Sequence, residues 1–89
     1  LAEHTEDQEA AFYYGIVLLG KGQAAVSQPI FQSVINNPPQ AAYLRPAKWY
    51  LALSHLKLGQ EQQARRLLEA LKSGEDRDAK SAKSALEAM

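Results

Sequence analysis

The chain has 89 residues, a formal net charge of zero and no cysteine. A chain of this length forms one small domain that buries only about 60–65% of the surface exposed by its unfolded form, so we expect modest stability. No run of about 18 apolar residues is present, which excludes a membrane-spanning helix, and the lack of cysteine excludes disulfides and thiolate chemistry. The first residue is Leu1 rather than methionine, and we therefore expect an excised fragment or a processed form.

The charges are unevenly distributed along the chain. Residues 1–9 hold four acids and no base, residues 10–40 hold Lys21 as their one charged residue, and residues 41–89 hold nine bases and six acids. The basic excess of the last segment is small and is interleaved with acids, whereas nucleic-acid binding requires a concentrated basic patch. The sequence therefore predicts no nucleic-acid partner.

Five helices and no convincing strand are predicted. The first helix is expected to follow Thr5, because the run from Thr5 to Gln8 is a capping-box pattern in which the two side chains bond reciprocally to backbone amides. This helix is expected to run to about Leu19. It should stop at Gly20, since glycine accepts the left-handed conformation of a helix C-terminus.

The second helix is expected from about Gln23 to Asn36, where apolar residues recur with helical spacing. Pro29 removes one backbone hydrogen bond inside this segment. We therefore expect either a kink near Ala25 and Val26 or a helix whose regular part begins later. The asparagine and proline run at residues 36–39 ends this part of the chain.

The remaining helices are expected at Pro46–Leu58, Gln60–Ser73 and Asp76–Ala88. Proline suits the first turn of a helix, and Gly59 and Gly74 are placed to end the third and fourth helices. The acids around Asp76 favour a helix start rather than an acid and base pair. The fifth helix has a thin, alanine-rich apolar stripe and is expected to cover the fourth.

The middle of the sequence contains an internal repeat. Residues 11–34 can be aligned with residues 48–71 at a single offset of 37 residues, which pairs Gly15 with Ala52, Gly22 with Gly59, Phe31 with Leu68 and Val34 with Leu71. A fixed period between roughly 20 and 50 residues is typical of stacked repeat proteins. The small residues are expected to let antiparallel helices approach closely, and the large apolar residues to fill the space between neighbouring helix pairs.

These helix pairs with glycine turns resemble tetratricopeptide repeats (TPRs), whose motif is W-x2-L-G-x2-Y, then A-x3-F, then P. In the first unit Gly15, Phe31 and Pro39 match the motif, and in the second Leu51 and Ala64 match it. The resemblance covers about residues 9–73. It implies a solenoid of antiparallel helix pairs in which the first helices line a concave, partner-binding face.

Several positions depart from the TPR pattern. Ala11 and Lys48 stand in the tryptophan slot, Leu18 and His55 in the tyrosine slot, and the offset exceeds the usual 34 residues by three. We assign the additional residues to the loop around Pro39–Tyr43, where an insertion costs little. The run from Ala47 to Leu53 is, more narrowly, similar to the last repeat of envelope-associated bacterial TPR proteins.

The first and third predicted helices each have two apolar stripes. One stripe is expected to face the partner helix of the same pair (Tyr14, Gly15 and Leu18; Leu51, Ala52, His55 and Leu58). The second stripe either packs in the core or contacts a ligand. With the amphipathic tyrosines beside it, this stripe gives the candidate partner-binding residues, which are Phe12, Tyr13, Ile16, Leu19, Trp49, Tyr50, Leu53 and Leu56.

No catalytic or metal-binding pattern is found. His4 lies in the first residues, His55 stands alone on an apolar helix face, and two distant histidines without cysteine do not make a zinc site. Gly20 to Gly22 is a helix-to-helix turn rather than a phosphate-binding loop. We therefore predict no enzyme activity, no metal and no cofactor.

The sequence thus predicts an all-α fold, namely an α-solenoid of two TPR-like antiparallel helix pairs and a C-terminal capping helix. Residues 1–89 form a single domain, with repeats at about 9–39 and 45–74 and the capping helix at about 76–88. The predicted function is a protein-interaction module that binds a peptide or partner helix. The alternative is a structural or self-associating end of a longer solenoid, for which a homodimer is one form. The compartment is left open between the cytoplasm and a bacterial envelope.

Overall fold

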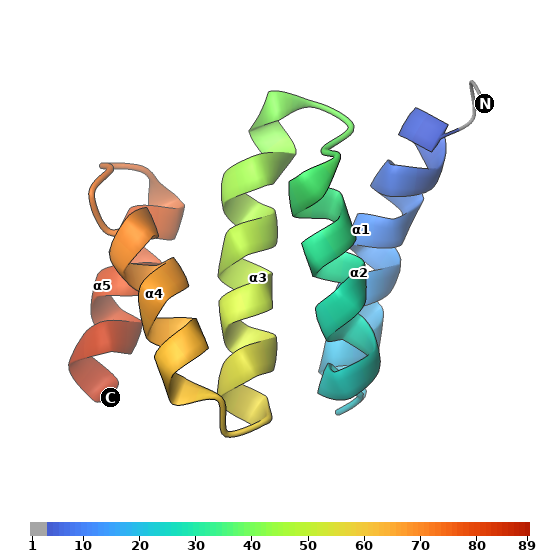
Figure 1. Cartoon of the computed structure of the whole chain (residues 1–89). Coiled ribbons are helices and arrows are strands. Elements are labelled where there is room, and N and C mark those ends of the chain that lie inside the picture. Colours follow the sequence, from blue (N-terminus) through green and yellow to red (C-terminus); the bar gives the residue numbers. More distant parts are fainter. Residues whose placement is uncertain (1–3) are drawn as a thin grey trace.

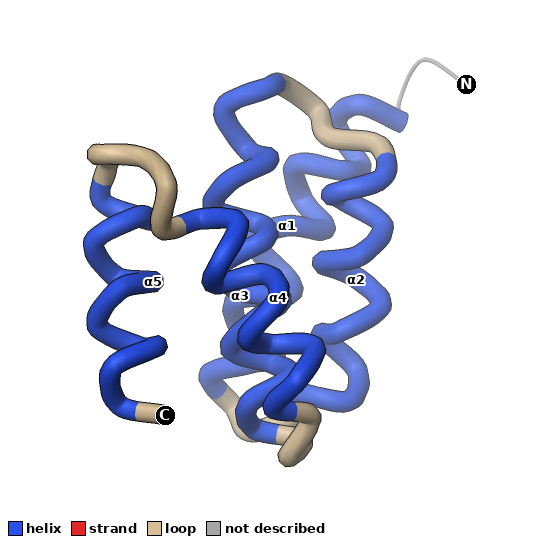
Figure 2. The backbone as a smooth tube through the Cα atoms, turned by 60° about the vertical axis from the view of Figure 1, so that its left-hand side comes forward, coloured by secondary structure: helices blue, strands red, loops and turns tan. Residues whose placement is uncertain are grey.

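The computed structural model describes the backbone of residues 4–89 and the side chains from Gln8 onward. This part of the chain is helical and contains no strand. Its elements are α1 (His4–Gly20), α2 (Ala24–Asn36), a short 3-10 helix η1 (Ala41–Tyr43), α3 (Leu44–Lys57), α4 (Glu61–Leu71) and α5 (Arg77–Ala88). Consecutive helices pack against one another, with α3 in the middle of the row (Figure 1). The predicted all-α fold is confirmed. Figure 2 shows that the connecting loops lie at the helix ends, on two opposite edges of the row of helices.

The turn from α1 to α2 is closed by Gly22 rather than by Gly20. Gly22 has a φ of +83°, whereas Gly20 is the last helical residue. The amide of Gln23 donates to the carbonyl of Leu18 at 2.9 Å, and the amide of Gly22 donates to that of Leu19 at 3.0 Å. These two bonds form a Schellman motif, whose left-handed residue is Gly22. The left-handed residue therefore lies two positions later than Gly20, where we predicted it. The capping role expected for Thr5 concerns a side chain outside the described residues, and α1 already begins at His4.

The turn from α3 to α4 repeats this geometry 37 residues later. Gly59 has a φ of +76°, the amide of Gln60 donates to the carbonyl of His55 at 2.8 Å, and the amide of Gly59 donates to that of Leu56 at 3.1 Å. The two Schellman motifs therefore use equivalent positions. The internal repeat in the sequence corresponds to a repeated local structure.

Helix α2 accommodates Pro29 in its interior. One of our two expectations was that the regular part of this helix begins later. That expectation is wrong, because the helix begins at Ala24. Pro29 cannot donate to the carbonyl of Ala25, but both residues are exposed, and that carbonyl is therefore accessible to water.

The boundaries of α3 and α4 differ from the prediction by about two residues. Helix α3 begins at Leu44, so Pro46 is its third residue, still within the first turn, where amides lack a helical partner. The loop before it contains the unpredicted 3-10 helix η1. Helix α4 ends at Leu71, before Ser73 and Gly74.

Helix α5 begins at Arg77, one residue after the predicted start, and ends at Ala88 as predicted. The Asp76 side chain is the N-cap and accepts a hydrogen bond from the amide of Ala79 at 2.9 Å. Ala79 and Ala82 are completely buried against the preceding helices, so the thin alanine stripe packs α5 closely onto α4.

The core consists of two clusters that meet at α3. Phe31 of α2 is completely buried in the first cluster, and Leu68 of α4 is completely buried in the second. Helices α1 and α2 approach closely because Gly15 has no side chain: a Cβ there would lie 3.0 Å from the ring of Phe31. The close approach and the filling role that the repeat predicted are both present.

Five of the seven residues of the expected packing stripes are buried, and two are instead at the surface: Tyr14, because α1 has α2 as its main neighbour, and Leu58, because it lies at the end of α3. Tyr14 is 58% exposed, and Leu58, the C-cap of α3, is 36% exposed. The buried arc of α1 contains Phe12, Gly15, Leu18 and Leu19.

Long polar side chains from equivalent positions hold the C-terminal ends of α2 and α4. The Nε2 of Gln8 donates to the carbonyls of Ser33 and Asn37, both at 2.9 Å. The Nη2 of Arg45, 37 residues later, donates to the carbonyl of Leu71 at 2.7 Å. Each contact ties the end of a pair's second helix to the start of its first, near a helix C-terminus where the helical partners of the carbonyls run out.

Candidate functional site

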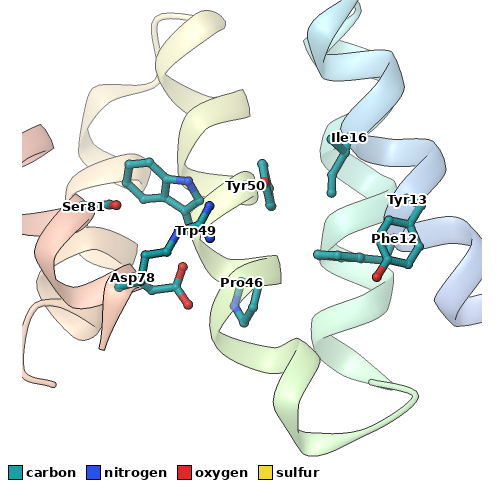
Figure 3. Close-up of a pocket in the computed structure, with 9 residues that line it drawn as sticks. Phe12, Tyr13, Ile16, Pro46, Trp49, Tyr50, Asp78 and Ser81 are labelled. Atoms are coloured by element: carbon teal, nitrogen blue, oxygen red, sulfur yellow. The ribbon is translucent and has the colours of Figure 1, made fainter. Parts of the chain in front are cut away.

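A groove crosses the face formed by α1, α3 and α5. Its volume is about 300 Å³, and Figure 3 shows side chains from the three helices around it. The lining residues come from α1 (Phe12, Tyr13, Ile16), from α3 (Pro46, Trp49, Tyr50) and from α5 (Arg77, Asp78, Ser81). Helices α1 and α3 thus contribute an apolar and aromatic wall, and α5 contributes a polar one.

Phe12 organises the aromatic wall. Its ring meets those of Tyr13 and Tyr43 edge to face, with 5.2 Å between centroids in each pair. It also meets Tyr50 at 5.9 Å and Phe31 at 6.2 Å in the same geometry. Edge-to-face pairs at these separations are favourable beyond the area they bury. The wall is therefore a continuation of the core and is held in one arrangement.

Tyr50 belongs partly to the groove and partly to the core. Its ring is stacked on Phe31, with 5.6 Å between centroids and 17° between planes. Tyr13 is 55% exposed at the groove. A substitution of Tyr50 would therefore disturb packing, whereas Tyr13 is accessible to a partner.

Tyr43 fixes the start of α3 to α1. Its hydroxyl donates a hydrogen bond to the Oε2 of Glu9. This bond, with a smaller contribution from a hydrogen bond with Tyr13, raises the pKa of Tyr43 above its ordinary range. The hydroxyl therefore stays protonated and remains a donor at neutral pH.

The polar wall of the groove is set by the N-terminus of α5. Arg45 donates from Nε to the Oδ2 of Asp76 at 2.7 Å and from Nη2 to its Oδ1 at 3.1 Å. Because Arg45 also holds the carbonyl of Leu71, it links α3 to both sides of the connection between α4 and α5. Gly74 leaves room for it, since a Cβ there would lie 2.9 Å from the Nη2.

The two acids at this helix start have opposite pKa shifts. Hydrogen bonds from Arg45 and from the amide of Ala79 lower the pKa of Asp76 below its ordinary value. Burial, with a smaller contribution from the negative charge of Asp76, raises the pKa of Asp78. Asp78 lines the groove, so the least solvated carboxylate of the pair faces the candidate site.

Trp49 lines both the groove and a second hollow. That hollow is lined by Trp49, Lys80, Ser81, Ser84 and Ala85. The indole is half-buried and lies between α3 and α5 (Figure 3). One aromatic side chain therefore contributes to both depressions.

Five of the eight candidate residues lie together along the groove, namely Phe12, Tyr13, Ile16, Trp49 and Tyr50. Leu19 is a buried core residue, Leu53 packs against the first core cluster and Leu56 against the second. The sequence did not indicate Pro46, Arg77, Asp78 or Ser81. That the α5 residues line the groove follows only from the position of α5 relative to α1 and α3, which no local sequence pattern indicates.

No group of three or more His, Cys, Asp or Glu side chains that could hold a metal ion occurs in the described part of the chain. His55 is 8% exposed and makes polar contacts with Gln28, at 2.9 Å from its Nδ1, and with Gln60, at 2.7 Å. It is the packed residue that the repeat predicted.

No helix among the described residues is long and apolar enough to cross a membrane. A comparison of the chain with protein-family models gave no match. Comparisons with curated proteins and with solved structures gave none either.

Proposed function

We propose that this chain is a protein-binding module of two TPR-like helix pairs with α5 as a capping helix. A peptide or a partner helix would lie in the groove between α1, α3 and α5. The observation that carries this proposal is the composition of the groove: an aromatic wall held by the core, opposite a short polar wall on a helix terminus.

The internal repeat supports the solenoid assignment. Equivalent positions of the two pairs form the same Schellman turn, and Ser27, Phe31 and Val34 of α2 are buried like their counterparts Ala64, Leu68 and Leu71 of α4. In stacked repeats each unit contacts its neighbours, and the stack presents one extended face. The groove lies on the face to which α1, α3 and α5 contribute.

The groove's chemistry favours an apolar anchor from the partner. Aromatic residues such as tryptophan and tyrosine are enriched at binding hot spots, because one end is apolar and the other can form hydrogen bonds. Arg77 and Asp78 are the charged lining residues and cancel each other. The volume, about 300 Å³, lies at the lower bound of small-molecule sites. It suits an inserted side chain of a larger partner.

The proposal is tested by filling the groove without removing any of its walls. Peptides are selected from a displayed random library on the immobilised chain, and their binding is followed by the fluorescence of Trp49, the one tryptophan in the sequence. Ser81→Phe should weaken binding of the selected peptides at least about tenfold, as expected for loss of a hot spot.

Val26→Phe is the matched control, because Val26 is 50% exposed on α2 and does not line the groove. It should leave affinity unchanged. Selected peptides that bind the Ser81→Phe variant as tightly as the unmodified chain would show that the groove is not the binding site.

A further inference from the structure

Helix α1 exposes apolar side chains on the side that faces away from α2. Tyr14 is 58% exposed and Val17 is 51% exposed, and Ala10, one turn earlier, is exposed as well. These three residues, which we call the outer face of α1, are not among those that line the groove. The face itself is uncharged, and Lys21 is the one charged residue between positions 10 and 40, whereas the acids of residues 1–9 precede Ala10.

The second helix pair shows what covers the same positions. At an offset of 37 residues, Ala10, Tyr14 and Val17 correspond to three residues of α3. These are Ala47, Leu51 and Ser54, whose exposed fractions are 0%, 2% and 0%. Ala47 and Leu51 belong to the same buried cluster as Phe31 and Val34 of α2. On α3, therefore, the helix that precedes it in the chain buries this face.

A polar contact accompanies this packing. The Nε2 of Gln28 on α2 donates to the Oε1 of Gln60 at 3.1 Å, at the turn that follows α3. Gln23 is the counterpart of Gln60 in the turn that follows α1, and it is exposed. The surface beside α1 thus repeats both the apolar positions and the glutamine that α2 uses on α3.

We propose that the outer face of α1 is a docking surface for one amphipathic helix that runs antiparallel to α1 and has the apolar stripe of α2. On α2 the residues that share a buried cluster with Ala47 and Leu51 are a small residue, an aromatic residue seven positions later and a β-branched residue three positions after that (Ala24, Phe31 and Val34). The occupant should be uncharged on this side, because an unpaired charge buried against Tyr14 and Val17 would be costly. This surface is separate from the proposed peptide groove.

The opposite end of the molecule explains why a head-to-tail copy is not the occupant. The surface of α5 presents Arg77, Lys80, Lys83 and Glu87, all exposed. Placing these charges against the uncharged outer face of α1 would desolvate them without partners. The α1 end resembles an interface, whereas the α5 end resembles a solvated surface.

The proposal is tested by adding a further helix pair in the register that the chain itself uses. Residues 4–43 are placed directly before residues 7–89, so that a second copy of α2 and of its connection to the next helix precedes α1 at the 37-residue spacing. The extended chain should unfold in a single transition. Its thermal midpoint should exceed that of the original chain by about 5 °C or more, the shift typical of roughly 1 kcal/mol in a domain of this size.

Two substitutions in the original copy of the extended chain complete the test. Val17→Lys should abolish the rise in thermal midpoint, because it places a charge in the new interface. Val26→Lys should preserve the rise: Val26 is equally exposed, but its counterpart Gln63 is exposed in the second pair.

Two separate transitions, with the original midpoint unchanged, would overturn the proposal. A mass that doubles with concentration in the unextended chain, and that Val17→Lys returns to the monomer, would also overturn it by assigning the face to a second copy.

Discussion

The two helix pairs share one register but have different neighbours. In both pairs a glycine in the left-handed conformation closes the turn, a long polar side chain ties the end of the second helix to the first, and a large apolar residue is completely buried. Helix α3 is packed between α2 and α4, whereas α1 contacts α2 as its main neighbour. Tyr14 is consequently exposed where its counterpart Leu51 is buried.

This difference shows that the repeated sequence sets the local conformation and that the neighbouring helix sets the exposure. The register determines which residues point in the same direction in both pairs. Whether such a residue is core or surface depends on an element outside its own pair. The same positions can therefore be core in one pair and a candidate interface in the other.

The largest expected effect comes from removing the residue that links the first pair to the second. Phe31→Ala should destabilise the fold by about 3–5 kcal/mol, because it removes a fully buried ring and leaves a cavity. Phe31 contacts Phe12 of α1 and Tyr50 of α3, so the loss should reach both pairs. Urea denaturation measures the change in unfolding free energy.

Leu68→Ala provides the comparison in the second pair. It should cost about 2–5 kcal/mol for the same reason. If Phe31→Ala is tolerated with less than about 1 kcal/mol while Leu68→Ala is not, the equivalence of the two positions fails, since fully buried truncations in cores do not have such small costs.

The small and large residues of each pair are expected to compensate each other. The first pair combines Gly15 with Phe31, which lie in direct contact, and the second combines Ala52 with Leu68 in one cluster. Gly15→Ala alone should cost roughly 1 kcal/mol, because overpacking of about 1–3 kcal/mol is partly offset by the better helix propensity of alanine. The double variant Gly15→Ala with Phe31→Leu gives the first pair the combination of alanine and leucine that the second pair has. Its smaller side chain at position 31 should relieve the overpacking.

A double-mutant cycle measures this compensation. The summed cost of the single variants should exceed the cost of the double variant by about 1 kcal/mol, which is typical for residues in contact. Additive costs would show that the two pairs do not use interchangeable combinations of volume.

Much of the fold could be predicted because the decisive signals are local. The helices follow from apolar spacing and from the turn glycines, and the N-cap Asp76 marks the start of α5. The prediction misplaced the left-handed residue by two positions, since Gly20 and Gly22 are both candidates and only the backbone geometry distinguishes them. It also placed Tyr14 on a packed side of α1, because the sequence of one helix pair does not show whether a neighbouring helix covers that side, as α2 covers Leu51.

The groove was predictable on one wall only. The candidate residues of α1 and α3 come from the second apolar stripe and the tyrosines beside it, and five of them, four aromatic residues and Ile16, line the groove. The polar wall depends on how α5 is set against α3, which is fixed by contacts of Arg45 with Asp76 and Leu71 across more than 25 residues. No local pattern indicates such contacts.

The smallest expected effect distinguishes the two connections between helices by their response to acid. After α4, Asp76 is the N-cap of α5 and Asp78 lies in its first turn, whereas their counterparts after α2 are the uncharged residues Pro39 and Ala41. The folded state lowers the pKa of Asp76 below the ordinary 3.8 and raises that of Asp78 above it. The stabilisation from ionised Asp76 is thus present above pH 3.8 and is lost as the pH falls through its folded pKa, whereas protonation of Asp78 favours the fold as the pH falls toward 3.8.

Thermal midpoints between pH 2 and pH 7 should reveal these opposite contributions. Asp76→Asn retains a capping side chain but removes the charge, so it should lower the midpoint at pH 7 and flatten its decline in acid. Asp78→Asn removes the opposing contribution, so the decline should become steeper than in the unmodified chain. Both differences should be small, since the two side chains are substantially solvated. If both variants instead shift the acid profile in the same direction, the two carboxylates at the start of α5 do not oppose each other, and this does not distinguish the start of α5 from the uncharged connection between α2 and α3.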